Sequence, residues 1–187
     1  MRTHSSTFLC LVLSAAMAAP ALAQETRADA AGANPISQSM RITWSEATRN
    51  LQQSAELAPE EILTFRPTDA VRSFGEILAH AAGSNYMFCA IAKGEKAPSN
   101  DDEILKVAAS KTKLAKAVAD SIAYCNGVMD ALTDQQAAEP VTAWGGRKMP
   151  RAAVLLLATS HLDLHYGNLV TYFRLKGIVP PSSRQGS

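Results

Sequence analysis

Residues 150–177 read PRAAVLLLATSHLDLHYGNLVTYFRLKG, and this stretch decides the fold class. Pro150 is placed for the first turn of a helix, where a missing N–H is tolerated. Gly177 fits the end of the same helix, and two prolines shortly beyond it are a stop signal. We therefore predict a helix from about Pro150 to Lys176, roughly 40 Å long at 1.5 Å per residue.

Three further helices are predicted upstream. Asn34 and Pro35 open the first, Thr68 caps the second and Ser110 caps the third. Apolar residues recur at three-to-four spacing in each, as in an amphipathic helix. The four expected helices cover about 35–58, 68–93, 110–132 and 150–176.

This pattern predicts an all-α protein, a four-helix bundle with two long connecting loops and no substantial sheet. The long connections follow the second and third helices. Such loops often carry function or close over a site. In the later one, residues 141–144 read as a short extended arm, followed by a turn at Gly145 and Gly146.

The N-terminus has the pattern of a secretory signal peptide. An apolar run follows Phe8, and Ala21-Leu22-Ala23 fits a cleavage site. The run is too short to span a bilayer. The expected organisation is a signal peptide over 1–23, a flexible leader over 24–34, the bundle over 35–183 and a tail over 184–187. We expect a periplasmic or secreted protein with no membrane span after processing.

Composition excludes some partners. The chain has 18 Lys and Arg against 17 Asp and Glu, and no basic patch is visible, so we expect no nucleic-acid partner. One domain is the natural expectation at this length. An unknown small molecule is the expected partner, and a bundle of this size is compatible with a homodimer.

Cys89 and Cys125 are the cysteines that remain after the signal peptide. If the second and third helices are antiparallel neighbours, Cys89 faces about residue 113. Cys125 then lies roughly 18 Å further along, which is too far for a disulfide. We therefore predict two buried free thiols.

Three histidines are the best lead to function. His161 and His165 are one turn apart, so their imidazoles leave the same helix face, and His80 lies mid-way along the second helix. If these helices are neighbours, three neutral imidazoles meet. Such a set favours zinc, nickel, copper or iron and leaves positions open for a substrate. The alternative is that they are ordinary core histidines, and the His-Glu-x-x-His protease motif is absent.

The block from Thr159 to Ser182 resembles the C-terminal helix of the DinB-like (DinB/YfiT-like) superfamily. That family has a His, three residues, then His-Arg-Gly-Gln, followed by an aliphatic and aromatic run that ends in Gly and Pro-Pro. The segment from Phe74 to His80 resembles its earlier His-bearing helix. The resemblance covers roughly residues 40–183 and implies a four-helix bundle with a three-histidine metal site. The implied ligands are His80, His161 and His165, and the expected metal is zinc or nickel.

Tyr166 and Asn168 depart from the family pattern, since they stand where Arg and Gln are usual. The resemblance therefore assigns neither of them a role. Some members are thiol-dependent S-transferases or a thiol-assisted isomerase, which use small cytosolic thiols. Predicted export separates this chain from such thiols, so we do not expect that activity.

Other polar residues could belong to the same site. Glu76, one turn before the second-helix histidine, could orient that ring, but we favour a surface acid. Asp163 points away from one or both of its neighbouring histidines, so we favour a residue that is not a ligand. Asn85 and Tyr172 could line the cavity. The turn that begins at Trp144 could cover it, although a plain connector is the favoured interpretation.

These features predict an exported metalloprotein that acts as a metal-dependent hydrolase or transferase on an unknown small substrate. No nucleophile–base pair or dedicated acid stands out, so catalytic residues stay unassigned. The alternative is a non-enzymatic module that binds a metal or a small ligand.

Overall fold

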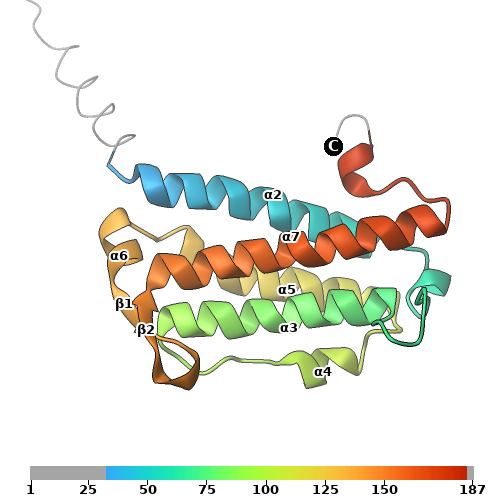
Figure 1. The fold of residues 1–187 in the computed structure, drawn as a ribbon, viewed down its shortest axis with the longest axis horizontal. Coiled ribbons are helices and arrows are strands. Elements are labelled where there is room, and N and C mark those ends of the chain that lie inside the picture. Colours follow the sequence, from blue (N-terminus) through green and yellow to red (C-terminus); the bar gives the residue numbers. More distant parts are fainter. Residues whose placement is uncertain (1–32, 185–187) are drawn as a thin grey trace, which may run out of the picture. The chain divides into compact units, whose positions relative to one another are not determined.

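The computed structural model describes residues 33–184, and four long helices dominate this part of the chain (Figure 1). The prediction of an all-α protein is confirmed, because the described sheet consists of two three-residue strands. The long helices are α2 (Pro35–Leu57), α3 (Phe74–Lys93), α5 (Lys111–Met129) and α7 (Arg151–Leu175). The short elements are η1 (Glu60–Ile62), α4 (Asp101–Leu105), α6 (Asp134–Ala138), β1 (Pro140–Thr142), η2 (Trp144–Gly146), β2 (Lys148–Pro150) and η3 (Pro181–Ser183).

The predicted signal peptide lies outside the described residues, as do most of the leader and of the tail. Within residues 33–184, none of the helices combines the length and the apolar character needed to cross a membrane.

α3 and α5 run in the same direction. Asn85 of α3 donates a hydrogen bond to Ser121 of α5, at 3.2 Å between Nδ2 and Oγ. Four residues further along each helix, Cys89 and Cys125 are joined by a disulfide. Since both contacts advance together, the two helices are parallel. Figure 1 shows α2 and α7 running opposite to α3.

The prediction of two free thiols is therefore wrong. It assumed antiparallel neighbours, whereas the connection after α3 returns along that helix and starts α5 beside the beginning of α3. A Cβ at Gly75 would overlap the backbone of Ala108, so the returning chain touches α3 closely. This crossover places the Cα atoms of Cys89 and Cys125 5.4 Å apart, within the range that a disulfide requires.

The second long helix begins at Phe74, six residues later than its predicted cap at Thr68. Ser73 is the N-cap: its hydroxyl accepts from the backbone N–H of Glu76, and the Glu76 carboxylate accepts from the N–H of Ser73. This reciprocal capping box satisfies two N–H groups that the helix leaves unpaired. The exposed segment before Ser73 is thereby left as a loop, and it forms one wall of the pocket described below.

The end of α7 agrees with its sequence signals. Gly177 has a φ of +68°, and the N–H of Ile178 bonds the carbonyl of Phe173 at 2.9 Å, which closes the helix. The predicted extended arm over residues 141–144 is present in part: β1 pairs antiparallel with β2, Val141 opposite Met149, whereas Trp144 begins η2. Both ends of α7 are thus fixed, and they set the positions of its histidines along the helix axis.

The disulfide generates a prediction for stability. Replacing both Cys89 and Cys125 by alanine should lower the free energy of unfolding by about 3–4 kcal/mol, because the bridge closes a loop with a sequence separation of 36. Urea denaturation of the two proteins measures this difference. Wild type that has been unfolded, reduced and refolded under reducing conditions should match the variant. An unchanged urea midpoint in the variant would contradict the cross-link.

Candidate metal centre

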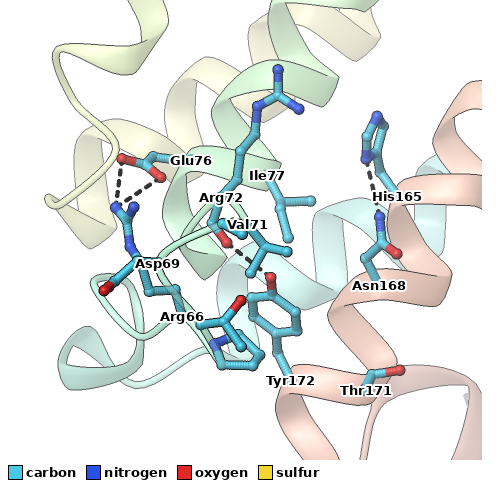
Figure 2. A pocket seen from close by; sticks show the side chains of 13 residues that line it. Arg66, Asp69, Val71, Arg72, Glu76, Ile77, His165, Asn168, Thr171 and Tyr172 are labelled. Carbon is cyan, nitrogen blue, oxygen red and sulfur yellow. Dashed lines mark hydrogen bonds and ion pairs between the residues drawn. The ribbon is translucent and has the colours of Figure 1, made fainter.

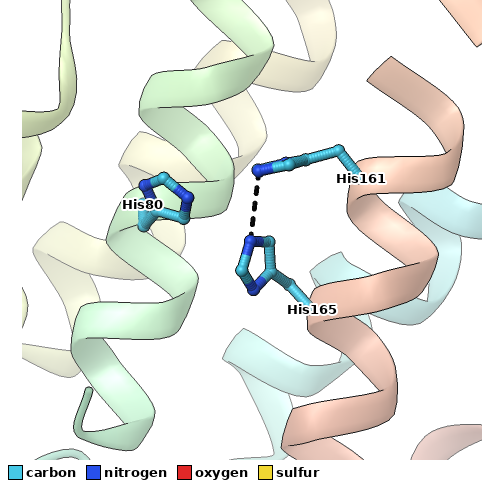
Figure 3. Close-up of side chains that lie close together, drawn as sticks. All are labelled: His80, His161 and His165. Atoms are coloured by element: carbon cyan, nitrogen blue, oxygen red, sulfur yellow. Dashed lines mark hydrogen bonds between the residues drawn. The ribbon is translucent and has the colours of Figure 1, made fainter. Parts of the chain in front are cut away.

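Three imidazoles meet between α3 and α7, as predicted for neighbouring helices (Figure 3). His161 and His165 project from one face of α7, and their Nε2 atoms lie 3.1 Å apart. The ring of His80, from α3, has its centroid 5.1 Å from that of His161 and 4.8 Å from that of His165. One ligand atom from each residue lies within 4.8 Å of the others.

A carboxylate fixes the orientation of His80. Its Nδ1 is hydrogen-bonded to Asp101 at the start of α4. An N–H at Nδ1 that donates to this carboxylate leaves the Nε2 lone pair for a ligand. Gly83 makes the approach of α4 possible, since a Cβ there would overlap Asp101. The short helix therefore acts as the support of the ring.

The other two imidazoles are held in their neutral form. Burial lowers the pKa of His165 to about 4, and its electrostatic interaction with the neighbouring His161 acts in the same direction. Burial, followed by the charge of His80, also lowers the pKa of His161. A neutral imidazole is the form that coordinates a metal, so both rings are ready to act as ligands near pH 7.

The donor set fits a divalent transition-metal ion. Two nitrogens that each lie about 2.1 Å from one ion are roughly 3.0–3.4 Å apart, and the His161–His165 separation of 3.1 Å falls in this range. Nδ1 of His161 is buried without a hydrogen-bond partner among the described residues. Three imidazoles with no thiolate are typical of zinc, nickel, copper or iron sites rather than of magnesium sites.

A pocket of about 790 Å³ opens beside His165 (Figure 2). Its walls come from the loop that precedes α3 and from the C-terminal half of α7. Tyr172 lines it, as the sequence suggested, and donates a hydrogen bond to the backbone carbonyl of Arg72 at 2.8 Å. The volume is that of a site for a small molecule.

Other candidates have structural roles. Glu76 is bound by Arg66 as well as by the capping box, and the backbone N–H of Ser73, with Arg66 contributing, holds its pKa below the usual value. Asp163 is exposed, and no hydrogen bond joins it to a histidine. Asn85 is buried against α5, away from the pocket.

The two departures from the family pattern differ in position. Tyr166 turns away from the histidines and binds Ser182, donating from its hydroxyl to Oγ at 2.7 Å. Asn168 lines the pocket, with Nδ2 3.5 Å from Nδ1 of His165. Trp144 packs edge-on against Phe88, whose ring in turn lies 5.5 Å from that of His161. The β1–β2 connection thus borders the site through Phe88.

Sequence reasoning missed Asp101 and Arg72. Asp101 lay in a connection whose path was unknown, and Arg72 was assigned to a helix that begins after it. The sequence held one signal for Asp101: Asn100, Asp101 and Asp102 form a typical start of a short helix, in a loop long enough to carry function.

The fold agrees with comparisons to known proteins. The family model described as the DinB superfamily matches residues 43–169. A DinB-like protein from Bacillus cereus has a TM-score of 0.66 at 17% identity, over 77% of this chain and 95% of its own. One from Bacillus subtilis has a TM-score of 0.63 at 22% identity, over 80% and 99%. A mycothiol-dependent maleylpyruvate isomerase has a TM-score of 0.59 at 14% identity, over 71% of this chain and 60% of its own. A sequence comparison with curated proteins gives no significant match.

Asp101→Asn should weaken metal binding by roughly 10- to 100-fold, because the amide orients His80 without the carboxylate's charge. Competition with a chelator measures the affinity. Asp102→Asn is the matched control: it removes the same charge from the next position of α4, where the side chain is exposed. Equal affinities in the two variants would show that Asp101 does not support the ring.

Proposed function

Because the chain belongs to the DinB superfamily and carries three converging histidines, we propose that it is a metalloprotein that holds a divalent ion, zinc or nickel, between α3 and α7. The observation that carries this proposal is the approach of the three imidazoles to within 4.8 Å, with Asp101 fixing the proton of one of them.

In this proposal His80, His161 and His165 hold the ion, and Asp101 retains the proton on Nδ1 of His80. The ion, when bound, supplies Lewis acidity to a substrate oxygen. The pocket beside His165 admits the substrate from the side of the loop before α3. This arrangement supports a metal-dependent hydrolase or transferase that acts on a small molecule. The likeness to the isomerase concerns the fold, so its thiol-dependent reaction is not part of the proposal.

One observation favours the second candidate, a module that binds metal or ligand without turnover. Among the described residues, the only carboxylate hydrogen-bonded to the three imidazoles is that of Asp101, and His80 occupies it. Two other carboxylates line the pocket: Glu76 is bound by Arg66 and by the capping box, and Asp69 makes no hydrogen bond to an imidazole in residues 33–184. Turnover of a substrate by the metal-loaded protein would favour the enzyme over the binding module.

Metal analysis tests the proposal. Protein purified without a histidine tag, loaded with zinc or nickel and desalted, should hold about one ion per chain. His161→Ala and His165→Ala should each lose most of the metal, and with it the gain in melting temperature that metal gives the wild type. Asp163→Asn is the control, since it alters an exposed residue between the two histidines.

Less than about 0.2 ion per chain in the wild type would contradict a true site, given the affinity expected for three imidazole ligands. Full retention of metal in both histidine variants would contradict it as well, because the ion would then lie elsewhere.

We also propose that the chain is exported and processed after Ala23. Two independent features support this: the signal-peptide pattern and the Cys89–Cys125 disulfide, a bond that persists in oxidising compartments. Expression of the full chain in a bacterial host, followed by fractionation and N-terminal sequencing, should give a periplasmic protein that begins at Gln24. An unprocessed protein in the cytosolic fraction would refute the proposal.

A further inference from the structure

The pocket beside His165 contains two arginines in different states. Arg66 is engaged: its Nη2 lies 3.0 Å and 3.1 Å from the two carboxylate oxygens of Glu76. The guanidinium of Arg72 has no hydrogen bond or ion pair to any residue in 33–184. One cation in the pocket is thus free to bind a ligand.

The backbone of Arg72 is held in place by its neighbours. The hydroxyl of Tyr172 donates to its carbonyl oxygen at 2.8 Å, and the next residue, Ser73, is the N-cap of α3. Tyr172 is itself fixed by edge-on packing against Phe65, with ring centroids 5.9 Å apart. The arginine therefore extends from a fixed point rather than from a loose loop, which reduces the entropy lost when its guanidinium binds a ligand.

Arg72 extends toward the histidines. Figure 2 shows its side chain passing Ile77, with the guanidinium on the side of the pocket where His165 lies and away from the Arg66–Glu76 pair. A ligand in the pocket can therefore touch both the guanidinium and the histidine cluster.

We infer that this pocket binds a small organic carboxylate, whose carboxylate pairs with Arg72 while a second donor atom points to the three histidines. The planar guanidinium matches a carboxylate through two parallel hydrogen bonds. The charges favour a monoanionic group over a phosphate dianion, because Arg66 is neutralised by Glu76 and Asp69 adds a negative charge to the wall. This inference rests on the proposed metal site for the second contact only.

The probes are the monohydroxamates of succinic, glutaric and adipic acid, each compared with the simple hydroxamate of the same carbon number. Both probes of a pair offer the same metal-binding group, and only one carries a carboxylate. Calorimetric titration of the cobalt-loaded protein should show one chain length at which the carboxylate strengthens binding by roughly 10- to 100-fold.

Arg72→Ala should abolish this advantage, and Arg72→Lys should retain part of it, since lysine keeps the charge but not the planar fork. Arg49→Ala is the matched control: it removes an equal charge from α2, outside the pocket, and should leave the advantage unchanged. Equal binding of both probes to the wild type at every chain length would overturn the inference, and so would an undiminished advantage in Arg72→Ala.

The same titration of metal-free protein separates this inference from the proposed function. If the wild type takes up no metal but its weaker binding of the carboxylate probe still depends on Arg72, the carboxylate site stands and the metal proposal fails. If metal binds but the carboxylate gives no advantage, the metal proposal stands and the inference fails. Absence of both effects would overturn both.

Discussion

The close approach of the 100–108 segment to α3 is the contact on which the rest of the structure depends. Gly75 and Gly83 make it possible, since a side chain at either position would overlap the returning chain. Because the chain returns along the whole of α3, α5 starts beside the beginning of α3 and runs parallel to it. The same contact sets Cys89 opposite Cys125 and Asp101 against His80. Helix order, covalent cross-link and the support of the candidate ligand therefore share one cause.

The histidine cluster and the pocket beside it attract ligands of opposite charge. Burial keeps the imidazoles of His161 and His165 neutral, so they attract a cation rather than repel it. The pocket next to them is lined by the guanidinium of Arg72, which has no partner within residues 33–184 and attracts an anion. The proposed metal site and the proposed anion site together would suit a ligand that carries both a donor atom for the ion and a negative group.

The disulfide bears on the candidate reaction, because it agrees with the proposed export from the cytosol. Disulfides persist in oxidising compartments, so the Cys89–Cys125 bond agrees with the proposed export. The fold is shared with a mycothiol-dependent enzyme, yet the sequence identity of 14% carries over no reaction. A metal and a carboxylate ligand, neither of which requires a thiol, are compatible with an exported protein.

The sequence by itself determined the four helices, the end of α7 at Gly177 and the three histidines, because periodicity, caps and one-turn spacing are local properties of the chain. It placed the start of the second helix too early, because Thr68 was taken as the cap although Ser73, with Glu76 three residues later, carries the local signature of a capping box. Tertiary structure alone decided the direction of α5, and with it the disulfide, because a long connection permits either direction. It also decided the roles of Asp101, which is hydrogen-bonded to His80 of α3, and of Arg72, which lines a pocket together with residues of α7.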